Sequence, residues 1–342
     1  MKAQVLQSTV DLHVNPEPLV FCDIRTPQPG PEDILIHIRA CGVCHTELDE
    51  IEGRTPPAFF PVIPGHQVVG TVCSCGCDVT RHSVEDRVGV AWIFRSCGQC
   101  SFCRKGFENL CSEFQATGRD ANGGYAEFMV VHQDYAFPIP SVLSDFETAP
   151  LLCAGAVGYR SLQLTGLTNG EPLGLTGFGG SGHLVLQLAG FLYPDSDIFV
   201  FTRNRVQQEF ALELGAVWAG STTTPSPQKL QAIIDTTPAW QPVVSALACL
   251  RPGGRVVINA IGKEDQDKHI LASLNYSHHL WLEKEIKSVA NVCRSDVVEF
   301  LGLAARLEIR PQTTLYPLED ANHALYDLKT KTVRGAKVLC IS

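Results

Sequence analysis

The segment from Leu173 to Ala189 constrains the fold of this chain more than any other. It begins with a short apolar stretch, Leu173–Thr176, typical of a buried strand, and ends in an apolar run from His183, typical of a helix. Between them lies a turn composed of Gly177, Phe178, Gly179, Gly180, Ser181 and Gly182. In this setting the glycines let a pyrophosphate reach backbone N–H groups at a helix N-terminus. The segment therefore predicts a dinucleotide site rather than a merely glycine-rich turn.

Strands and helices alternate from about residue 171 onward. Further strands are expected at Ile198–Phe201, Ala232–Ile234 and Arg255–Asn259, with a helix at Val206–Leu214. This alternation is the signature of an α/β domain with a parallel, doubly wound Rossmann sheet.

The end of the second strand indicates which dinucleotide binds. Asp197 lies twenty residues after Gly177, where an acid is expected, but it precedes the strand Ile198–Phe201. The ribose-binding acid belongs at the carboxyl end of that strand, where Thr202 and Arg203 stand. Without a carboxylate there, Arg203 can bind a 2′-phosphate through a charge-assisted contact, so NADP(H) is expected to be preferred and NAD(H) remains possible. The alternative is that Arg203 is a solvated residue at a helix start.

The first 150 residues are β-rich. Runs such as Ile34–Ile38, Val68–Val72 and Arg87–Val90 are separated by Pro-Gly and glycine-rich turns, which predicts a small, partly open barrel. The segment Cys73–Cys77 carries three cysteines, but Gly76 implies a turn and no fourth ligand lies at a matching spacing, so a metal site is not expected there.

Four closely spaced cysteines follow at Cys97, Cys100, Cys103 and Cys111. Thiolates at these separations can close a tetrahedron around one structural zinc ion and stabilise a loop with little core of its own. The rival is an iron–sulfur cluster, but the fourth cysteine is too distant and no proline follows it.

A second metal site is suggested by Cys44 and His66, which both lie beside glycines. Alone, such a pair is more often structural. Ser144 and Glu147 form a capping box that opens a helix, and this helix delivers Cys153, a candidate third ligand that could equally be a packing residue.

Length and charge exclude several classes of protein. A chain of 342 residues exceeds one typical core, so two domains are expected. A net charge of −9 without a basic run argues against nucleic-acid binding, and no run has membrane-spanning length or signal-peptide character. We expect a cytoplasmic location, where the 14 cysteines would be mostly reduced and act as metal ligands rather than disulfides.

Five motifs in this order resemble the zinc-dependent alcohol dehydrogenases of the medium-chain dehydrogenase/reductase family, across nearly the whole chain. They are Gly42–Thr46, Gly65–His66, the four-cysteine lobe, Leu152–Gly155 and the glycine turn at Gly177–Gly182. The resemblance implies a GroES-like catalytic domain from residues 1–152 and 287–342, with its zinc lobe near 95–113, and a Rossmann domain at 153–286. It also implies that Cys44, His66 and Cys153 bind one zinc ion together, which makes two zinc ions per chain.

The resemblance further implies a reversible hydride transfer between a small-molecule alcohol, expected to be primary, or an aldehyde and the nicotinamide. Thr46 would hydrogen-bond the substrate oxygen, Glu47 would orient His66, and His45 would contact the cofactor pyrophosphate. Asn291 would lie beside the nicotinamide. Relatives are usually homodimers or homotetramers, and no nucleic-acid or membrane partner is expected.

Two departures from the family pattern concern the chemistry. Asp49 stands where many relatives carry the histidine that ends the proton relay, so a carboxylate or water would pass the proton to solvent. Gln67 replaces an acid after the zinc histidine, which should leave zinc more electrophilic.

Trp92 would line an apolar substrate pocket or be an ordinary core residue. A zinc- and nucleotide-binding sensor or structural protein without turnover is the alternative to an enzyme.

Overall fold

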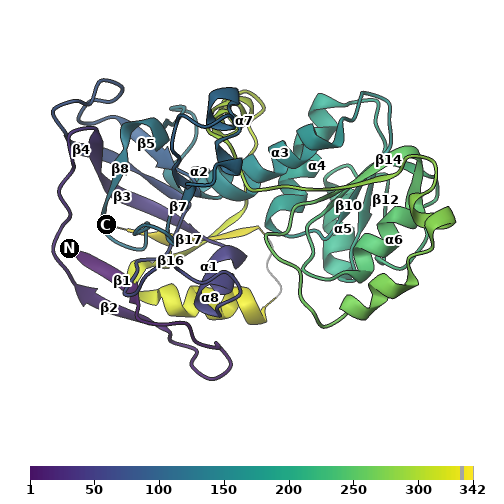
Figure 1. Ribbon diagram of the computed structural model, residues 1–342, viewed down its shortest axis with the longest axis horizontal. Helices are drawn as coiled ribbons and strands as arrows, with labels where there is room; N and C mark the ends of the chain where they lie inside the picture. Colours follow the sequence, from purple (N-terminus) through teal and green to yellow (C-terminus); the bar gives the residue numbers. More distant parts are fainter. Residues whose placement is uncertain (332–334, 342) are drawn as a thin grey trace. The chain divides into compact units, whose positions relative to one another are not determined.

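The computed structural model describes residues 1–331 and 335–341. Its chain divides into two compact units, one formed by residues 1–156 and 292–342 and the other by residues 157–291. Figure 1 shows the purple N-terminal strands and the yellow C-terminal elements within the same unit. The boundaries expected after residues 152 and 286 lie four and five residues before these divisions, and Cys153 falls in the first unit.

The first unit is mainly antiparallel. Its strands are β1 (Lys2–Leu6), β2 (Leu19–Asp23), β3 (Asp33–Val43), β4 (Val68–Cys75), β5 (Arg87–Val90), β6 (Ile93–Arg95), β7 (Gln115–Ala116), β8 (Phe128–His132), β9 (Phe137–Pro138), β16 (Thr313–Pro317) and β17 (Ala336–Cys340). Its helices are α1 (His45–Ile51), α2 (Asp145–Pro150), α7 (Arg294–Arg306) and α8 (Ala321–Thr330). A seven-stranded sheet has the order β16-β17-β3-β4-β5-β9, with β8 also paired to β3.

Strand β3 organises this sheet. Its first half pairs with β8, its last residues pair with β17, and β4 runs along it in antiparallel register. Alternate residues Ile34, Ile36 and Ile38 are fully buried, which is the period-two pattern of a strand with one face in a core. The expected β-rich, partly open architecture follows from this shared strand.

The second unit contains the parallel sheet. Its elements are α3 (Ala156–Thr165), β10 (Leu173–Thr176), α4 (Gly180–Leu192), β11 (Ile198–Phe201), α5 (Arg205–Glu213), β12 (Trp218–Gly220), β13 (Leu230–Asp235), α6 (Gln241–Cys249), β14 (Leu250–Ile258) and β15 (Glu285–Ser288). The strand order β12-β11-β10-β13-β14-β15 is the 3-2-1-4-5-6 order of a doubly wound sheet. This confirms the predicted fold, and β10 and β11 have the predicted bounds.

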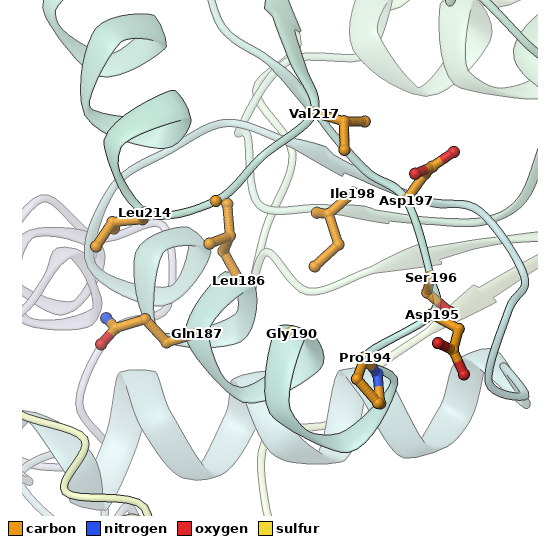
Figure 2. Close-up of a pocket in the computed structure, with 11 residues that line it drawn as sticks. Leu186, Gln187, Gly190, Pro194, Asp195, Ser196, Asp197, Ile198, Leu214 and Val217 are labelled. Carbon is orange, nitrogen blue, oxygen red and sulfur yellow. The ribbon is translucent and has the colours of Figure 1, made fainter.

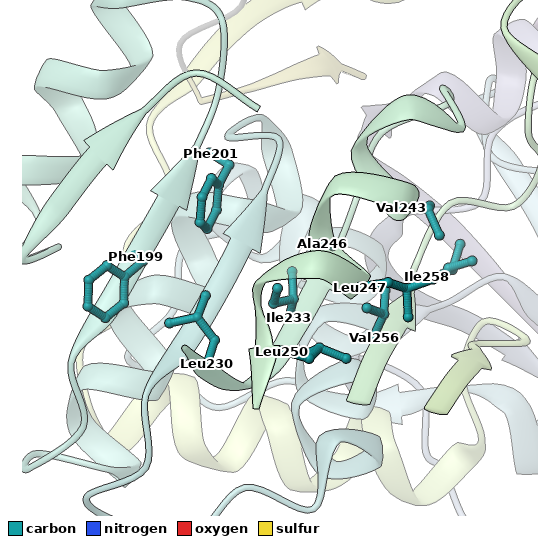
Figure 3. Packing of buried hydrophobic residues seen from close by; sticks show 10 residues of the cluster. All are labelled: Phe199, Phe201, Leu230, Ile233, Val243, Ala246, Leu247, Leu250, Val256 and Ile258. Carbon is teal, nitrogen blue, oxygen red and sulfur yellow. The ribbon is translucent and has the colours of Figure 1, made fainter. Parts of the chain in front are cut away.

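One hydrophobic cluster fixes α6 against this sheet. Phe201 on β11, Ile233 on β13 and Val256 on β14 belong to the same buried cluster as Val243 and Leu247 of α6, and all five are labelled in Figure 3. All five side chains are less than 5% exposed. Full burial of one such side chain stabilises the folded state by about 1.5–3 kcal/mol. The core thereby holds the carboxyl ends of the strands in place, where ligands bind in sheets of this kind.

Candidate active site

Antiparallel register brings Cys44 and His66 together although they are far apart in the sequence. Cys41 on β3 pairs with Val68 on β4, so the residues that follow the first strand meet those that precede the second. Cys44 then begins α1, and its N–H donates to the Glu47 carboxylate at 2.8 Å. The positive φ of Gly65, +97°, and the contact that a Cβ there would make with Tyr125, 2.3 Å, require glycine before His66.

Helix α2 and the turn that follows it bring Cys153 to Cys44 and His66. Helix α2 begins with the predicted capping box, in which Ser144 Oγ accepts from Glu147 N at 3.3 Å. The helix packs against β3, β4 and β17 and continues into a π-type turn, Leu151–Gly155, that carries Cys153. Such turns are frequent at functional sites because they redirect one side chain.

The three predicted ligands form one cluster. The sulfurs of Cys44 and Cys153 and a ring nitrogen of His66 all lie within 4.8 Å of one another. Nδ1 of His66 is 2.5 Å from Glu47 Oε1, and both side chains are 0% exposed. Nε2 of His66 is buried and has no hydrogen-bond partner within the described chain. A buried imidazole fixed at Nδ1 by a carboxylate, with Nε2 aimed at two thiols, fits a tetrahedral zinc site with an open fourth position.

Electrostatics in the cluster favour a thiolate. A hydrogen bond with Cys153 lowers the pKa of Cys44 well below its usual range, while that same contact and burial raise the pKa of Cys153. Burial alone would disfavour a charged His66, but the Glu47 carboxylate and Cys44 together raise its pKa. Thr46 is buried, and its Oγ1 lies 3.6 Å from Cys44 Sγ. The hydroxyl is thus beside the metal-binding cluster, at the predicted place.

The four cysteines of the lobe also form one cluster. Cys100 Sγ lies 3.5 Å and Cys97 Sγ 3.9 Å from Cys103 Sγ, and the backbone N–H of Cys97 donates to Cys111 Sγ at 3.5 Å. Four sulfurs at zinc-bonding distance from one ion lie roughly 3.8 Å apart. A backbone hydrogen bond from Cys103 lowers the pKa of Cys100 to about 7, while burial raises that of Cys111 to about 11. The lobe fits a second zinc ion.

The three cysteines of the segment 73–77 are not gathered in this way. Cys73 Sγ donates to Leu35 O at 3.3 Å, and Cys75 Sγ lies 3.8 Å from His82 O. Within the described residues, only the two clusters above group three or more possible ligands.

The glycine turn of the second unit opens α4. Gly177 has a φ of +81°, and a Cβ there would lie 2.5 Å from Thr236 Oγ1, so no larger residue fits. A Cβ on Gly179 would meet nothing within 4 Å, which leaves open space at the helix N-terminus. A Cβ on Gly182 would lie 2.8 Å from Gly177 O. The turn therefore has the close packing and the open backbone that a pyrophosphate requires.

Thr202 and Arg203 lie at the carboxyl end of β11, as predicted. Thr202 is buried and its Oγ1 donates to Gln207 Oε1 at 2.6 Å, whereas Arg203 is exposed. Asp197 lies at the opposite end of the strand and lines a surface pocket of about 530 Å³ with Asp195 and Ser196 (Figure 2). Gln228 Nε2 donates to the Asp197 carboxylate at 3.0 Å. Asp197 is therefore excluded as the ribose-binding acid.

Comparison with known proteins assigns the family. The Alcohol dehydrogenase GroES-like domain model matches residues 30–141. A relative named probable alcohol dehydrogenase AdhA of Mycobacterium tuberculosis is 43% identical over 329 residues, which covers 95% of this chain and 93% of that protein. An alcohol dehydrogenase of Moraxella is 31% identical over 348 residues and covers 99% of each chain. The chain belongs to the zinc-dependent alcohol dehydrogenases of the medium-chain dehydrogenase/reductase family.

Solved structures agree with this assignment. Cinnamyl alcohol dehydrogenase from Sorghum bicolor superposes with a TM-score of 0.83 at 26% identity and covers 99% of this chain and 98% of that one. CAD from Helicobacter pylori complexed with NADP(H) has a TM-score of 0.86 at 23% identity, covers 99% of this chain and 97% of that chain, and supports the fold. This member of the family is thus an NAD(P)-dependent oxidoreductase that acts on alcohols. None of its described helices has the length and apolarity needed to cross a membrane.

In this alcohol dehydrogenase Asp49, the residue expected to end a proton relay, forms an ion pair with Arg54. Asp49 Oδ1 accepts from Arg54 Nε at 2.5 Å, and Arg54 Nη1 also contacts Glu52 at 2.7 Å. Burial raises the pKa of Asp49, although Arg54 opposes the shift. The side chains of Asp49 and Arg54 are 17% and 46% exposed, so the pair reaches from the helix to solvent. His45 is exposed at the start of the same helix.

The residue that the sequence analysis missed is Glu50. Both of its carboxylate oxygens are buried without a hydrogen-bond partner in the described chain, and burial raises its pKa well above the usual value. Trp92 and Arg119 lie near it, and Arg119 stacks 5.0 Å over the buried Trp92 ring. Glu50 lies three residues after Glu47, so the two share one face of the helix, and this spacing is the sequence feature that could have identified it. The surroundings of Trp92 are therefore partly polar.

Asn291 is the last residue of the second unit. Its φ is +54°, a left-handed conformation that asparagine tolerates, and its Oδ1 is buried without a partner among the described residues. Gln67 is buried and packs against Gly42, where a Cβ would lie 2.6 Å from Oε1 of the glutamine. Glycine at position 42 therefore leaves the space that the side chain of Gln67 occupies.

Proposed function

We propose that this enzyme is an NADP(H)-preferring alcohol dehydrogenase, equally an aldehyde reductase, that binds two zinc ions per chain. The observation that carries the proposal is the cluster of Cys44, His66 and Cys153 within 4.8 Å, with a buried His66 Nε2 that lacks a partner in the described chain. A sensor without turnover would not require Thr46 beside these ligands. Zinc bound there would supply Lewis-acid polarisation of the substrate oxygen.

The protein's own groups would then hold the substrate and move its proton. Thr46 Oγ1 would accept the substrate hydroxyl proton as the alcohol ionises while its own proton passes on toward Asp49, and both transfers would run in reverse when an aldehyde is reduced. Glu47 fixes the His66 ring through Nδ1, which leaves Nε2 free for the metal. Asp49, held by Arg54, is the group that would pass the proton to solvent, while His45 and the turn at Gly177–Gly182 would bind the pyrophosphate.

The cofactor preference rests on the end of β11. The residue after this strand is Thr202, and the exposed Arg203 follows it, so no carboxylate repels a 2′-phosphate at these two positions. The NADP(H) complex of the structurally similar Helicobacter pylori protein shows that this fold accepts the phosphate in another chain. NAD(H) would bind without the charge-assisted contact.

The substrate is proposed to be a primary alcohol or its aldehyde. Several relatives, among them one from Populus deltoides at 37% identity, are named probable cinnamyl alcohol dehydrogenases, and cinnamyl alcohol is a primary allylic alcohol. Trp92 offers an aromatic wall, and it packs on Phe114 with ring centroids 5.2 Å apart. Asn291, the last residue of the second unit, would contact the nicotinamide.

The decisive test of the zinc site is Cys153→Ala. We expect the variant to keep its fold and its lobe zinc, to lose the other zinc, and to lose hydride transfer. We would measure zinc content, circular dichroism and initial rates. The rates would be measured with a panel of primary, aromatic and allylic alcohols and aldehydes, each with NADP(H) and NAD(H). Cys249→Ala, a half-buried cysteine of the other unit, is the control. Full activity in Cys153→Ala, or no turnover by the two-zinc wild type, would sink the proposal.

A further inference from the structure

A buried lysine ties together the two loops that follow β13 and β14. The side chain of Lys263 is 8% exposed, and its Nζ contacts the carboxylate of Asp235, which is 0% exposed. The same Nζ donates to the carbonyl oxygens of Thr237 at 2.7 Å and Ala239 at 2.9 Å. An ammonium group has three N–H donors, so these three acceptors satisfy it completely.

The two loops are also joined through their backbones. Asn259 N donates to Asp235 O at 2.8 Å where both strands end, and Glu264 N donates to Pro238 O at 2.9 Å. Both loops therefore lie at the carboxyl edge of the parallel sheet. Ligands of open α/β sheets bind outside this edge. The lysine thus stabilises a part of the binding edge that contains none of the predicted cofactor residues.

The first of these loops rests directly on the glycine turn. Thr236 donates to Thr176 O through its N–H at 2.9 Å and through its hydroxyl at 3.0 Å. A Cβ on Gly177 would lie 2.5 Å from Thr236 Oγ1. Displacement of the loop would therefore disturb the turn, because Thr236 is hydrogen-bonded to Thr176, the residue directly before Gly177.

Stability alone is a weak reason for this arrangement. A buried ion pair often contributes no more stability than apolar side chains of the same volume, since the charges lose their hydration. Here the ammonium group bridges one carboxylate and two carbonyl groups of a neighbouring loop, which apolar residues cannot do. Lys263 differs from a packing residue because its hydrogen bonds fix the position of the loop beside Gly177.

We propose that Lys263 is a positioning residue for the dinucleotide, which acts by holding the loops 236–239 and 260–264 beside the glycine turn. Strand β10 separates β13 from β11, where Arg203 follows, so Lys263 should act equally on NAD(H) and NADP(H). The inference rests on dinucleotide binding by this unit and not on the preference between the two cofactors.

The test is the affinity of Lys263→Met for both reduced cofactors. We expect the dissociation constants of NADH and NADPH, measured by titration of nicotinamide fluorescence, to rise about tenfold and by the same factor, since misplaced binding groups weaken a complex. Zinc content should not change. Lys268→Met is the matched control, because that lysine forms an exposed pair with Asp265 at 3.0 Å. Its affinities should equal those of the wild type.

A second variant separates positioning from folding. Lys263→Met leaves a buried carboxylate unpaired and could unfold the unit, whereas Asp235→Asn with Lys263→Met removes both charges. We expect the double variant to fold and still to bind both cofactors more weakly, and Lys263→Arg to restore part of the affinity. Unchanged constants in either folded variant would overturn the inference. A loss confined to NADPH would do so as well, because it would place the lysine at the 2′-phosphate.

Discussion

The environment of one imidazole nitrogen links the geometry of the first unit to its chemistry. His66 Nδ1 contacts Glu47, while the buried Nε2 has no partner within the described chain and lies among the thiols of Cys44 and Cys153. An unsatisfied buried nitrogen of this kind costs about 1–3 kcal/mol. Coordination of a metal ion would remove that cost. The zinc proposal therefore accounts for a polar atom that packing leaves unexplained.

The proposed cofactor preference rests on one exposed residue, Arg203. We predict that Arg203→Ala weakens NADP(H) binding by about 1.5 to 3 kcal/mol, the range for a hydrogen bond to a charged group, and leaves NAD(H) binding nearly unchanged. Fluorescence titration with both reduced cofactors measures the difference. Arg205→Ala is the control, since Arg205 is exposed and lies 3.9 Å from Glu209. An equal loss for both cofactors would refute the preference.

The four-cysteine lobe has polar contacts with the start of α7 at two neighbouring residues, Glu108 and Asn109. Arg294 Nε lies 2.9 Å from Glu108 Oε1, and Cys293 Sγ donates to Asn109 Oδ1 at 2.9 Å. These contacts attach the lobe to the start of α7.

We predict that Cys100→Ser releases one zinc ion and lowers the free energy of unfolding by about 2 to 5 kcal/mol, because a structural metal orders its loop. Metal analysis, chemical denaturation and proteolysis within residues 97–111 report these changes. Cys77→Ser, at an exposed cysteine outside both clusters, should change none of them. A variant that retains two zinc ions and full stability would contradict the assignment.

At the scale of the molecule, one edge of the parallel sheet is left exposed. All four residues of β15 are exposed, and this strand ends the six-stranded order. Ile286 is 45% exposed, and the nearby Trp281 and Leu282 are 54% and 51% exposed. An edge strand with exposed apolar side chains readily pairs with another chain. We infer that two copies of this chain pair here as a homodimer, from which a tetramer could be built.

Replacement of Ile286 by lysine tests this assembly. We expect the charge to raise the dimer dissociation constant by roughly tenfold or more, since an unpaired charge at an interface costs several kcal/mol. Light scattering across a concentration series measures it, and circular dichroism checks the fold. Val298→Lys, at an exposed residue of α7, is the control. An Ile286→Lys protein with the wild-type assembly would place the interface elsewhere.

The sequence by itself determined the features that depend on local spacing. The glycine turn between a strand and a helix, the Ser144–Glu147 capping box and the four cysteines of the lobe each act within a few residues, so pattern and chemistry suffice to predict them. The bounds of β10 and β11 were predicted for the same reason, because buried parallel strands are continuous apolar runs.

Only the tertiary structure decided the features that depend on contacts across the chain. The register of β3 with β4 and the turn after α2 unite Cys44, His66 and Cys153, whose sequence spacing does not show the cluster. The pairing of Asp49 with Arg54, the burial of Glu50 and the loop contacts of Lys263 were likewise not foreseen. The physical reason is that burial and partners, which set the ionisation and orientation of a side chain, exist only once distant segments have packed.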